Sequence, residues 1–197
     1  MSSGSYILSF TGASLSISES VKIAEVYLRL RNWEAVKLEV KGSNLIQART
    51  QSSIQRVYQE LQPRLAQLSL EQLELLVEGN PQEQKQLLWL AVCKRYEYIR
   101  EFASEVVREK FLRLDYQLND FDYDAFYNRK ADWHPELDKL KDSSRQKMKT
   151  RIFRMLLEAE LITSDNHIIP TTFSQRSKDV LAPDAPMSYQ IFLISAF

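Results

Sequence analysis

The 197-residue sequence has few of the residues that usually signal special chemistry or long loops. It contains one cysteine, two histidines, four glycines and six prolines. A single cysteine excludes an intrachain disulfide, and Cys93 lies inside an apolar run, which predicts a small buried hydrophobic side chain. So few glycines and prolines argue against a loop-rich or disordered chain.

An excess of charge of one sign is also missing, because Lys+Arg and Asp+Glu both number 26. A general attraction to nucleic acid is therefore excluded, and any such binding needs local segregation of charge. The longest apolar run, Leu87 to Cys93, is far shorter than the roughly 20 residues that cross a bilayer. No Lys or Arg precedes Lys22, so the charged start of a signal peptide is absent. We expect a cytoplasmic protein without a membrane partner.

Signatures of catalysis are absent as well: no Walker loop, dinucleotide fingerprint or nucleophile elbow is present. His134 and His167 each lack a neighbouring cysteine or second histidine, which argues against zinc. The aspartates between Asp115 and Asp124 do not have the spacing of an EF-hand, and we interpret them as caps and solvated turn residues. The sequence predicts a protein that is not an enzyme and has no metal, no cofactor and no small-molecule substrate.

What the sequence does contain is a strong central helical stretch, Leu76 to Leu112. Asn80 and Glu83 have the spacing of a capping box, and Pro81 takes the first helical position. Apolar residues then recur at helical spacing. A break near residues 96–98 would divide the stretch into two helices.

Caps and apolar spacing predict further helices joined by short connections, which favours antiparallel neighbours in a bundle. Gly79 is expected to end one helix in the left-handed conformation, and Pro63 to interrupt another. The expected helices cover residues 19–31 behind Ser18, 33–41 between Asn32 and Gly42, a third from Thr50 or Ser52, 70–78 behind Ser69, 123–133, and a short segment up to Lys141.

Three segments resemble the BrxA family, the small helical component of bacterial BREX phage-resistance systems. They are the central stretch, the N-terminal pattern of Thr11-Gly12 and Glu19-Ser20, and the segment Thr150 to Ile162. The last departs from the family pattern, because Glu160 stands where a glycine is usual. The resemblance covers about Thr11 to Thr172 and contains no catalytic signature.

The resemblance implies a system in which host DNA is marked by methylation and unmarked phage DNA is stopped from replicating. Family members look like the all-helical antitermination protein NusB, which binds nucleic acid and protein. Other BREX proteins are the implied partners.

The sharpest segregation of charge falls in a helix that Asp142 or Ser143 is predicted to cap and that runs to about Leu161. Six basic residues and one acidic residue between Lys141 and Arg154 give a local net charge of +5. At about 100° per residue, Met148, Ile152, Met155, Leu156 and Ala159 share one side. Lys147, Arg151 and Arg154 share another side with Ser143 and Thr150, while Arg145 and Lys149 flank the apolar stripe on its opposite edge. The predicted DNA-binding residues are Arg145, Lys147, Lys149, Thr150, Arg151 and Arg154, with Lys41 and Arg49 as a second basic group.

After this helix, residues 164–166 form a turn signal, and 167–169 before Pro170 form a β-like run. Basic helix, turn and strand together outline a winged helix, whose helix enters the major groove. Residues 189–197 are expected to be a strand that pairs with this hairpin, or an apolar tail that docks on a partner.

The predicted fold is mainly α: a NusB-like helical bundle over residues 1–114, and a C-terminal helical part over 115–197 with a small winged-helix-like β element. The predicted function is non-catalytic, non-specific binding of double-stranded DNA through its phosphates within a BREX system. The alternative is a protein-interaction adaptor with a plain solvated basic face. The aromatics between Tyr116 and Trp133 suit an adaptor if they are open, and a second small core if they are buried.

Overall fold

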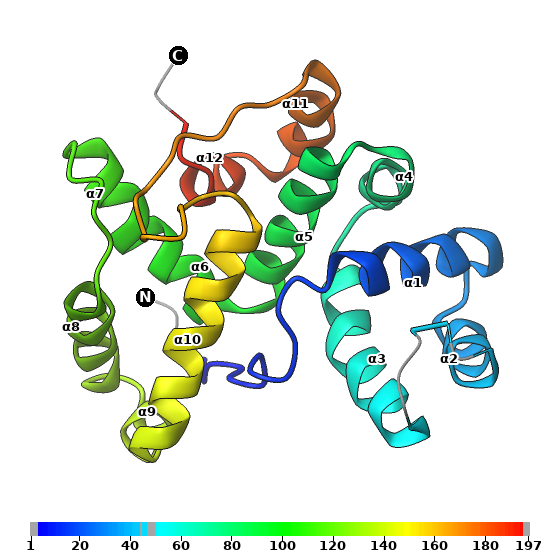
Figure 1. Ribbon diagram of the computed structural model, residues 1–197, viewed down its shortest axis with the longest axis horizontal. Helices are drawn as coiled ribbons and strands as arrows, with labels where there is room; N and C mark the ends of the chain where they lie inside the picture. The colour runs from blue at the N-terminus through cyan, green and yellow to red at the C-terminus, as the bar shows by residue number, and fades with distance from the viewer. Residues whose placement is uncertain (1–3, 44, 47–49, 195–197) are drawn as a thin grey trace.

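The computed structural model is mainly α-helical, and it describes residues 4–43, 45–46 and 50–194 (Figure 1). The helices in chain order are α1 (Ile17–Leu30), α2 (Trp33–Gly42), α3 (Gln51–Leu65), α4 (Leu70–Glu78), α5 (Pro81–Arg95), α6 (Glu97–Phe102), the π-helical η1 (Ala103–Val107), α7 (Arg108–Leu112), α8 (Asp120–Ala131), α9 (Pro135–Asp138), α10 (Asp142–Glu158), α11 (Gln175–Leu181), the 3-10 helix η2 (Ala182–Asp184) and α12 (Met187–Ile191).

Helix α5 runs through the middle of the molecule, with α1 to α4 on one side and α6 to α10 on the other (Figure 1). Every residue from Leu87 to Cys93 is buried, because neighbours surround this helix on all sides. The prediction of a buried central helix is confirmed, and so is the burial of Cys93. Burial raises the pKa of the Cys93 thiol well above its ordinary value, so the group stays protonated.

The expected break in the central stretch occurs at Tyr96, whose backbone is extended (φ −118°, ψ 97°) between α5 and α6. A second irregularity follows that the sequence did not reveal. In η1 the Arg108 N–H donates to the carbonyl of Ala103, five residues back. The wider turn shifts the buried face of the helix, and Phe102 just before it packs against Tyr123, Phe126 and Phe153.

Side-chain caps explain six of the helix starts, those of α2, α3, α4, α5, α8 and α11. The capping box of Asn80 and Glu83 is formed, and the Asn32 side chain accepts two backbone N–H groups of α2. Gly79 is extended (φ −73°, ψ 163°) rather than left-handed, so that prediction is wrong. A glycine is still required there, because an added Cβ would overlap the Leu75 carbonyl oxygen.

Two other local predictions are wrong. Helix α1 begins at Ile17, behind a left-handed Ser16 (φ 50°) that makes no side-chain cap, so Ser18 is not the cap. Pro63 lies inside α3 rather than interrupting it. Its missing N–H removes one hydrogen bond near the helix end, and burial of Leu61 and Leu65 keeps the last turn helical.

The predicted β element is not found among the described residues. Only isolated antiparallel bridges form there, Gln117 with His167 and Ile162 with Ile168. Near the C-terminus, α12 replaces the expected strand, and Phe192 and Leu193 pack into the core of the same molecule. Residues 195–197 of the predicted tail lie outside the described residues.

The extended N-terminal segment, residues 6–16, is held by a buried ion pair on α3. Arg64 is 3% exposed and donates to the Ser14 carbonyl at 2.5 Å and to the Ala13 carbonyl at 3.2 Å. Glu60 accepts the Ala13 N–H at 2.8 Å and pairs with Arg64 at 2.5 Å. An added Cβ on Gly12 would overlap the Glu60 carboxylate, so the Thr11-Gly12 pattern keeps space for this pair.

The same segment reaches the C-terminal half of the chain. The Leu15 N–H donates to Glu158 Oε2 of α10 at 2.9 Å, and the Tyr6 N–H donates to Glu136 Oε1 of α9 at 2.7 Å. The Tyr6 ring also stacks on His134 with centroids 3.9 Å apart. The division into residues 1–114 and 115–197 stays a prediction, and these contacts join its two parts.

We predict that Arg64→Met lowers the free energy of unfolding by about 3–5 kcal/mol, because it leaves the Glu60 carboxylate buried without its partner. The Glu60 side chain is only 10% exposed, and two backbone carbonyls lose their donor as well. Urea unfolding followed by circular dichroism measures the change. The matched control is Arg29→Met, which removes a solvent-exposed pair with Glu39 and should cost no more than about 1 kcal/mol. Equal losses of stability for the two variants would contradict the structural role of the buried Arg64–Glu60 pair.

Candidate nucleic-acid interface

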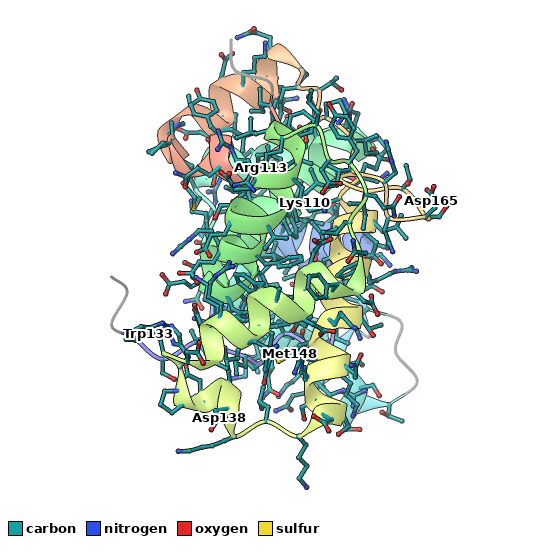
Figure 2. All side chains as sticks on the ribbon, turned by 90° about the vertical axis from the view of Figure 1, so that its left-hand side faces the viewer. Lys110, Arg113, Trp133, Asp138, Met148 and Asp165 are labelled. Carbon is teal, nitrogen blue, oxygen red and sulfur yellow. The ribbon has the colours of Figure 1, made fainter. Side chains whose placement is uncertain are left out.

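Helix α10 has the two faces that its sequence predicts. Its apolar side is buried as expected, and the buried residues are Met148, Ile152, Met155, Leu156 and, at the cap, Ala159. The helix is shorter than predicted, since it ends at Glu158. The prediction that Asp142 or Ser143 caps it is wrong, because Lys141 is at the N-cap and makes no capping hydrogen bond. In Figure 2, Met148 lies beside the lower half of α10, on the side toward α8.

Two of the predicted DNA-binding residues are used inside the protein. Lys149 is 8% exposed, and its Nζ lies 2.8 Å from Asp120 Oδ2 and 4.0 Å from Asp124 Oδ1. Arg145 pairs with Asp124 at 3.1 Å, and its guanidinium lies over the Tyr127 ring at 4.3 Å. Both side chains therefore hold α10 against α8 instead of facing solvent.

The aromatic part of α8 forms a core under this contact. Tyr123, Phe126 and Tyr127 are buried, and the Tyr127 hydroxyl donates to the Leu137 carbonyl at 2.6 Å. Burial raises the pKa of both Tyr123 and Tyr127, so their hydroxyls stay neutral. The expected burial is confirmed for these three residues, but they do not form a second core, because they pack on Tyr98 and Phe102 as part of one core with the central helices. Phe121 (77% exposed) and Trp133 (82% exposed) remain open.

The outward face of α10 carries the remaining predicted residues: Lys147, Thr150 and Arg154 are exposed, and Arg151 is half-buried. Arg154 donates to Glu158 Oε1 at 2.6 Å, and the other oxygen of that carboxylate accepts the Leu15 N–H. Within the described residues, Lys147 and Arg151 form no ion pair. They lie four residues apart, so one turn of helix places their cationic groups on the same side.

The second basic group is not brought to this face. Lys41 is in the last turn of α2, and Figure 1 shows α3 between α2 and α10. Its backbone carbonyl accepts a hydrogen bond from Gln51 Nε2 at 3.2 Å. Arg49 lies outside the described residues.

No hairpin wing accompanies α10 in the described part of the chain. The turn at residues 163–167 is closed by backbone hydrogen bonds between Thr163 and His167 (2.9 Å) and between Asn166 and Thr163 (3.0 Å). His167 also bridges to Gln117 and lies 5.7 Å from the Tyr116 ring. A third segment, residues 116–118, thus packs beside the turn, and the pairing is too short to form a strand.

Sequence reasoning missed the acidic partners of α10. Asp120 and Asp124 were interpreted as solvated turn residues, and the structure places them four residues apart on α8, opposite Arg145 and Lys149. The only available signal was the pattern itself, an acidic helix start followed by a basic helix. Among the described residues, no group of three or more His, Cys, Asp or Glu side chains is arranged to hold a metal ion. None of the described helices is long and apolar enough to span a bilayer.

Fold and site together define a class: a mainly α-helical protein in which a basic helix packs on an acidic helix and keeps a second basic face outward. A family model described as BrxA matches residues 4–184. The chain belongs to the BrxA family, as the sequence resemblance indicated.

Relatives agree with this assignment. The BREX protein BrxA of Escherichia coli O9:H4 (strain HS) is 28% identical over 148 residues, which cover 75% of this chain and 70% of that protein. The BREX protein BrxA of Paramagnetospirillum magneticum (strain ATCC 700264 / AMB-1) is 24% identical over 178 residues, 90% of this chain and 86% of that protein.

One solved structure shares the fold, an uncharacterized protein from Magnetospirillum magneticum. It superposes with a TM-score of 0.83 at 21% identity, covering 96% of this chain and all of that chain. At this identity the likeness concerns the fold alone.

We predict that Lys149→Gln destabilises the protein by about 1–2 kcal/mol, because the lysine stem loses its packing and Asp120 loses a charge-assisted hydrogen bond. The loss stays modest because Asp120 is 74% exposed and remains solvated. Lys147→Gln, the matched change on the outward face, should stay within about 0.5 kcal/mol of the wild type. Thermal and urea unfolding compare the two. If both variants unfold alike, Lys149 is not a structural residue.

Proposed function

We propose that this protein is a non-catalytic component of a BREX phage-resistance system and binds double-stranded DNA through phosphate contacts. The BREX assignment draws on the printed names of the two BrxA relatives. The observation that carries the DNA proposal is the outward face of α10, where Lys147 and Arg151 are not neutralised by a carboxylate in the described part of the protein. Thr150 adds a neutral hydroxyl to the same face.

Ion pairs reduce the number of basic side chains on α10 that are available to DNA. Of the six basic residues between Lys141 and Arg154, three are paired with aspartate or glutamate, namely Arg145, Lys149 and Arg154. Lys141, Lys147 and Arg151 form no ion pair with any residue that the structure describes. A patch of two or three charges favours weak, non-specific attraction to phosphates over readout of base edges, which needs side chains placed in a groove. The predictions for Arg145 and Lys149 are thereby the weaker part of the proposed site.

We predict that the purified protein binds a short unrelated duplex with a steep dependence on salt. If two or three phosphates are neutralised, the dissociation constant should rise roughly 10- to 40-fold between 50 and 200 mM salt. The double change Lys147→Gln with Arg151→Gln should reduce the slope of log K against log salt by about 2. Fluorescence anisotropy titrations at several salt concentrations measure both quantities.

The matched control is Arg113→Gln with Arg176→Gln, which removes the same charge from exposed positions just after α7 and on α11. This control should bind like the wild type. A further arm, Lys41→Gln with Arg49→Gln, examines the second basic group. If wild-type protein fails to bind at low salt, the DNA proposal is wrong. If binding survives the Lys147 and Arg151 changes, the site lies elsewhere.

The alternative function, a protein-interaction adaptor, draws on the two open aromatic side chains. Phe121 is in the first turn of α8, and Trp133 follows two residues after the end of that helix. The helix from Phe121 to Ala131 alone spans about 15 Å, so the two side chains do not form one contiguous patch through α8. Figure 2 shows Trp133 near the edge of the molecule, away from Lys110 and Arg113. Tryptophan is the residue type most enriched in interface hot spots. Capture of other BREX proteins that is lost in Trp133→Ala, with DNA binding absent, would favour the adaptor.

A further inference from the structure

Arg154 differs from the other two paired basic residues of α10 in how much of its side chain faces solvent. The Arg154 side chain is 61% exposed, whereas Arg145 is only 24% exposed and Lys149 is buried, both of them against α8. Arg154 also lies on the same side of the helix as Lys147 and Arg151, because the three are spaced four and three residues apart. The ion pairs therefore remove Arg145 and Lys149 from the outward face and leave Arg154 on it.

The ion pair of Arg154 uses only one edge of its guanidinium. The Nε atom donates to Glu158 Oε1 at 2.6 Å, about one helical turn further along α10. The two terminal nitrogens carry four of the five N–H groups, and they form no hydrogen bond to any residue in the described part of the chain. Paired N–H groups of this kind bind two oxygens of one phosphate side by side. The contact with Glu158 thus leaves the phosphate-binding end of the guanidinium open.

The Glu158 carboxylate is itself fixed by the N-terminal segment. Its Oε2 accepts the Leu15 N–H at 2.9 Å, and the Glu158 side chain is only 18% exposed. Leu15 is buried, and its carbonyl accepts from Ser20 Oγ at 3.1 Å, so this part of the backbone is bound on both sides. A carboxylate whose two oxygens are bound by different groups has little freedom to rotate. Glu158 therefore holds Arg154 Nε in one orientation.

We propose that Glu158 is a positioning residue for DNA binding, which orients the Arg154 guanidinium toward a phosphate beside those contacted by Lys147 and Arg151. This inference rests on the proposed binding of DNA. An arginine side chain that is already ordered loses less conformational freedom when it binds a phosphate. The opposite effect of Glu158 would be competition, in which its negative charge keeps Arg154 from the phosphate. The experiment has to separate these two effects.

The experiment extends the salt-dependent anisotropy titrations to Arg154→Gln and Glu158→Asp in the full chain. Arg154→Gln removes one phosphate contact, so the slope of log K against log salt should decrease by about 1. Glu158→Asp keeps the negative charge and is one methylene shorter, which is too short to reach the Leu15 N–H and Arg154 Nε together. The slope should then stay the same, and the dissociation constant should rise about 2- to 10-fold.

A double variant separates positioning from a general disturbance of the helix end. If Glu158 acts through Arg154, Glu158→Asp should have no effect on DNA binding when Arg154→Gln is already present. The matched controls are Arg29→Gln and Glu39→Asp, which alter a similarly exposed ion pair of α1 and α2 and should leave DNA binding unchanged. Thermal unfolding verifies that each variant folds. If Glu158→Asp does not fold, Glu158→Gln takes its place in the same comparison.

Three results would overturn the positioning role while DNA binding by the wild type stands. A wild-type slope in Arg154→Gln would mean that Arg154 does not contact DNA. Unchanged or tighter binding by the Glu158 variant would mean that Glu158 has no effect or competes with the phosphate. An equal effect of the Glu158 change with and without Arg154 would mean that Glu158 has a structural role only. If the wild type fails to bind at low salt, the proposed function is wrong, and this inference is wrong with it.

Discussion

The buried ion pair of Arg64 and Glu60 is the constraint on which the arrangement of this protein depends. Backbone groups of an extended segment need partners when they are buried, and residues 12–15 have no helix or sheet to supply them. Arg64 donates to two of their carbonyls and Glu60 accepts one of their N–H groups. The charges make these hydrogen bonds strong, and each charge also compensates the other in a site that excludes water.

The segment of residues 12–15, held in this way, then contacts the basic helix α10. Immediately after the residues bound by Arg64 and Glu60, the Leu15 N–H donates to Glu158, and the same carboxylate accepts from Arg154. Ser20 at the start of α1 donates to the Leu15 carbonyl at 3.1 Å, so both sides of this residue are bound. The Thr11-Gly12 and Glu19-Ser20 patterns, far from α10 in sequence, therefore act on it through one short stretch of backbone.

The sequence was informative where the physics is local. Asn32, Ser69 and Asn80 cap helices through hydrogen bonds to residues two or three positions away, and such spacing is visible in a single sequence. The break at Tyr96 and the apolar face of α10 are of the same kind. Gly79 was misread because two physical needs select glycine, a left-handed backbone and a lack of space for a Cβ, and only the second applies here.

The sequence was uninformative where the partner is distant. Helical spacing placed Arg145 and Lys149 correctly beside the apolar stripe of α10, and nothing in that spacing shows that α8 brings Asp120 and Asp124 against them. The count of +5 is a property of a segment, whereas a phosphate responds to the charges that remain after tertiary pairing. The prediction of a winged-helix hairpin was wrong for a related reason. Strand pairing depends on neighbours such as Gln117, which lie far away in the chain.

Two glutamates with different partners lie at the C-terminal end of α10. Glu158 is the last helical residue and binds inward, to Arg154 and to the backbone of Leu15. Two residues later the chain leaves the helix through a left-handed Glu160, whose carboxylate pairs with Lys85 on α5. A glycine would adopt this conformation without strain, so the glutamate is favoured by what its side chain contacts and not by the turn. The end of α10 thus directs two carboxylates to different partners, because Glu158 binds the N-terminal segment and Glu160 binds α5.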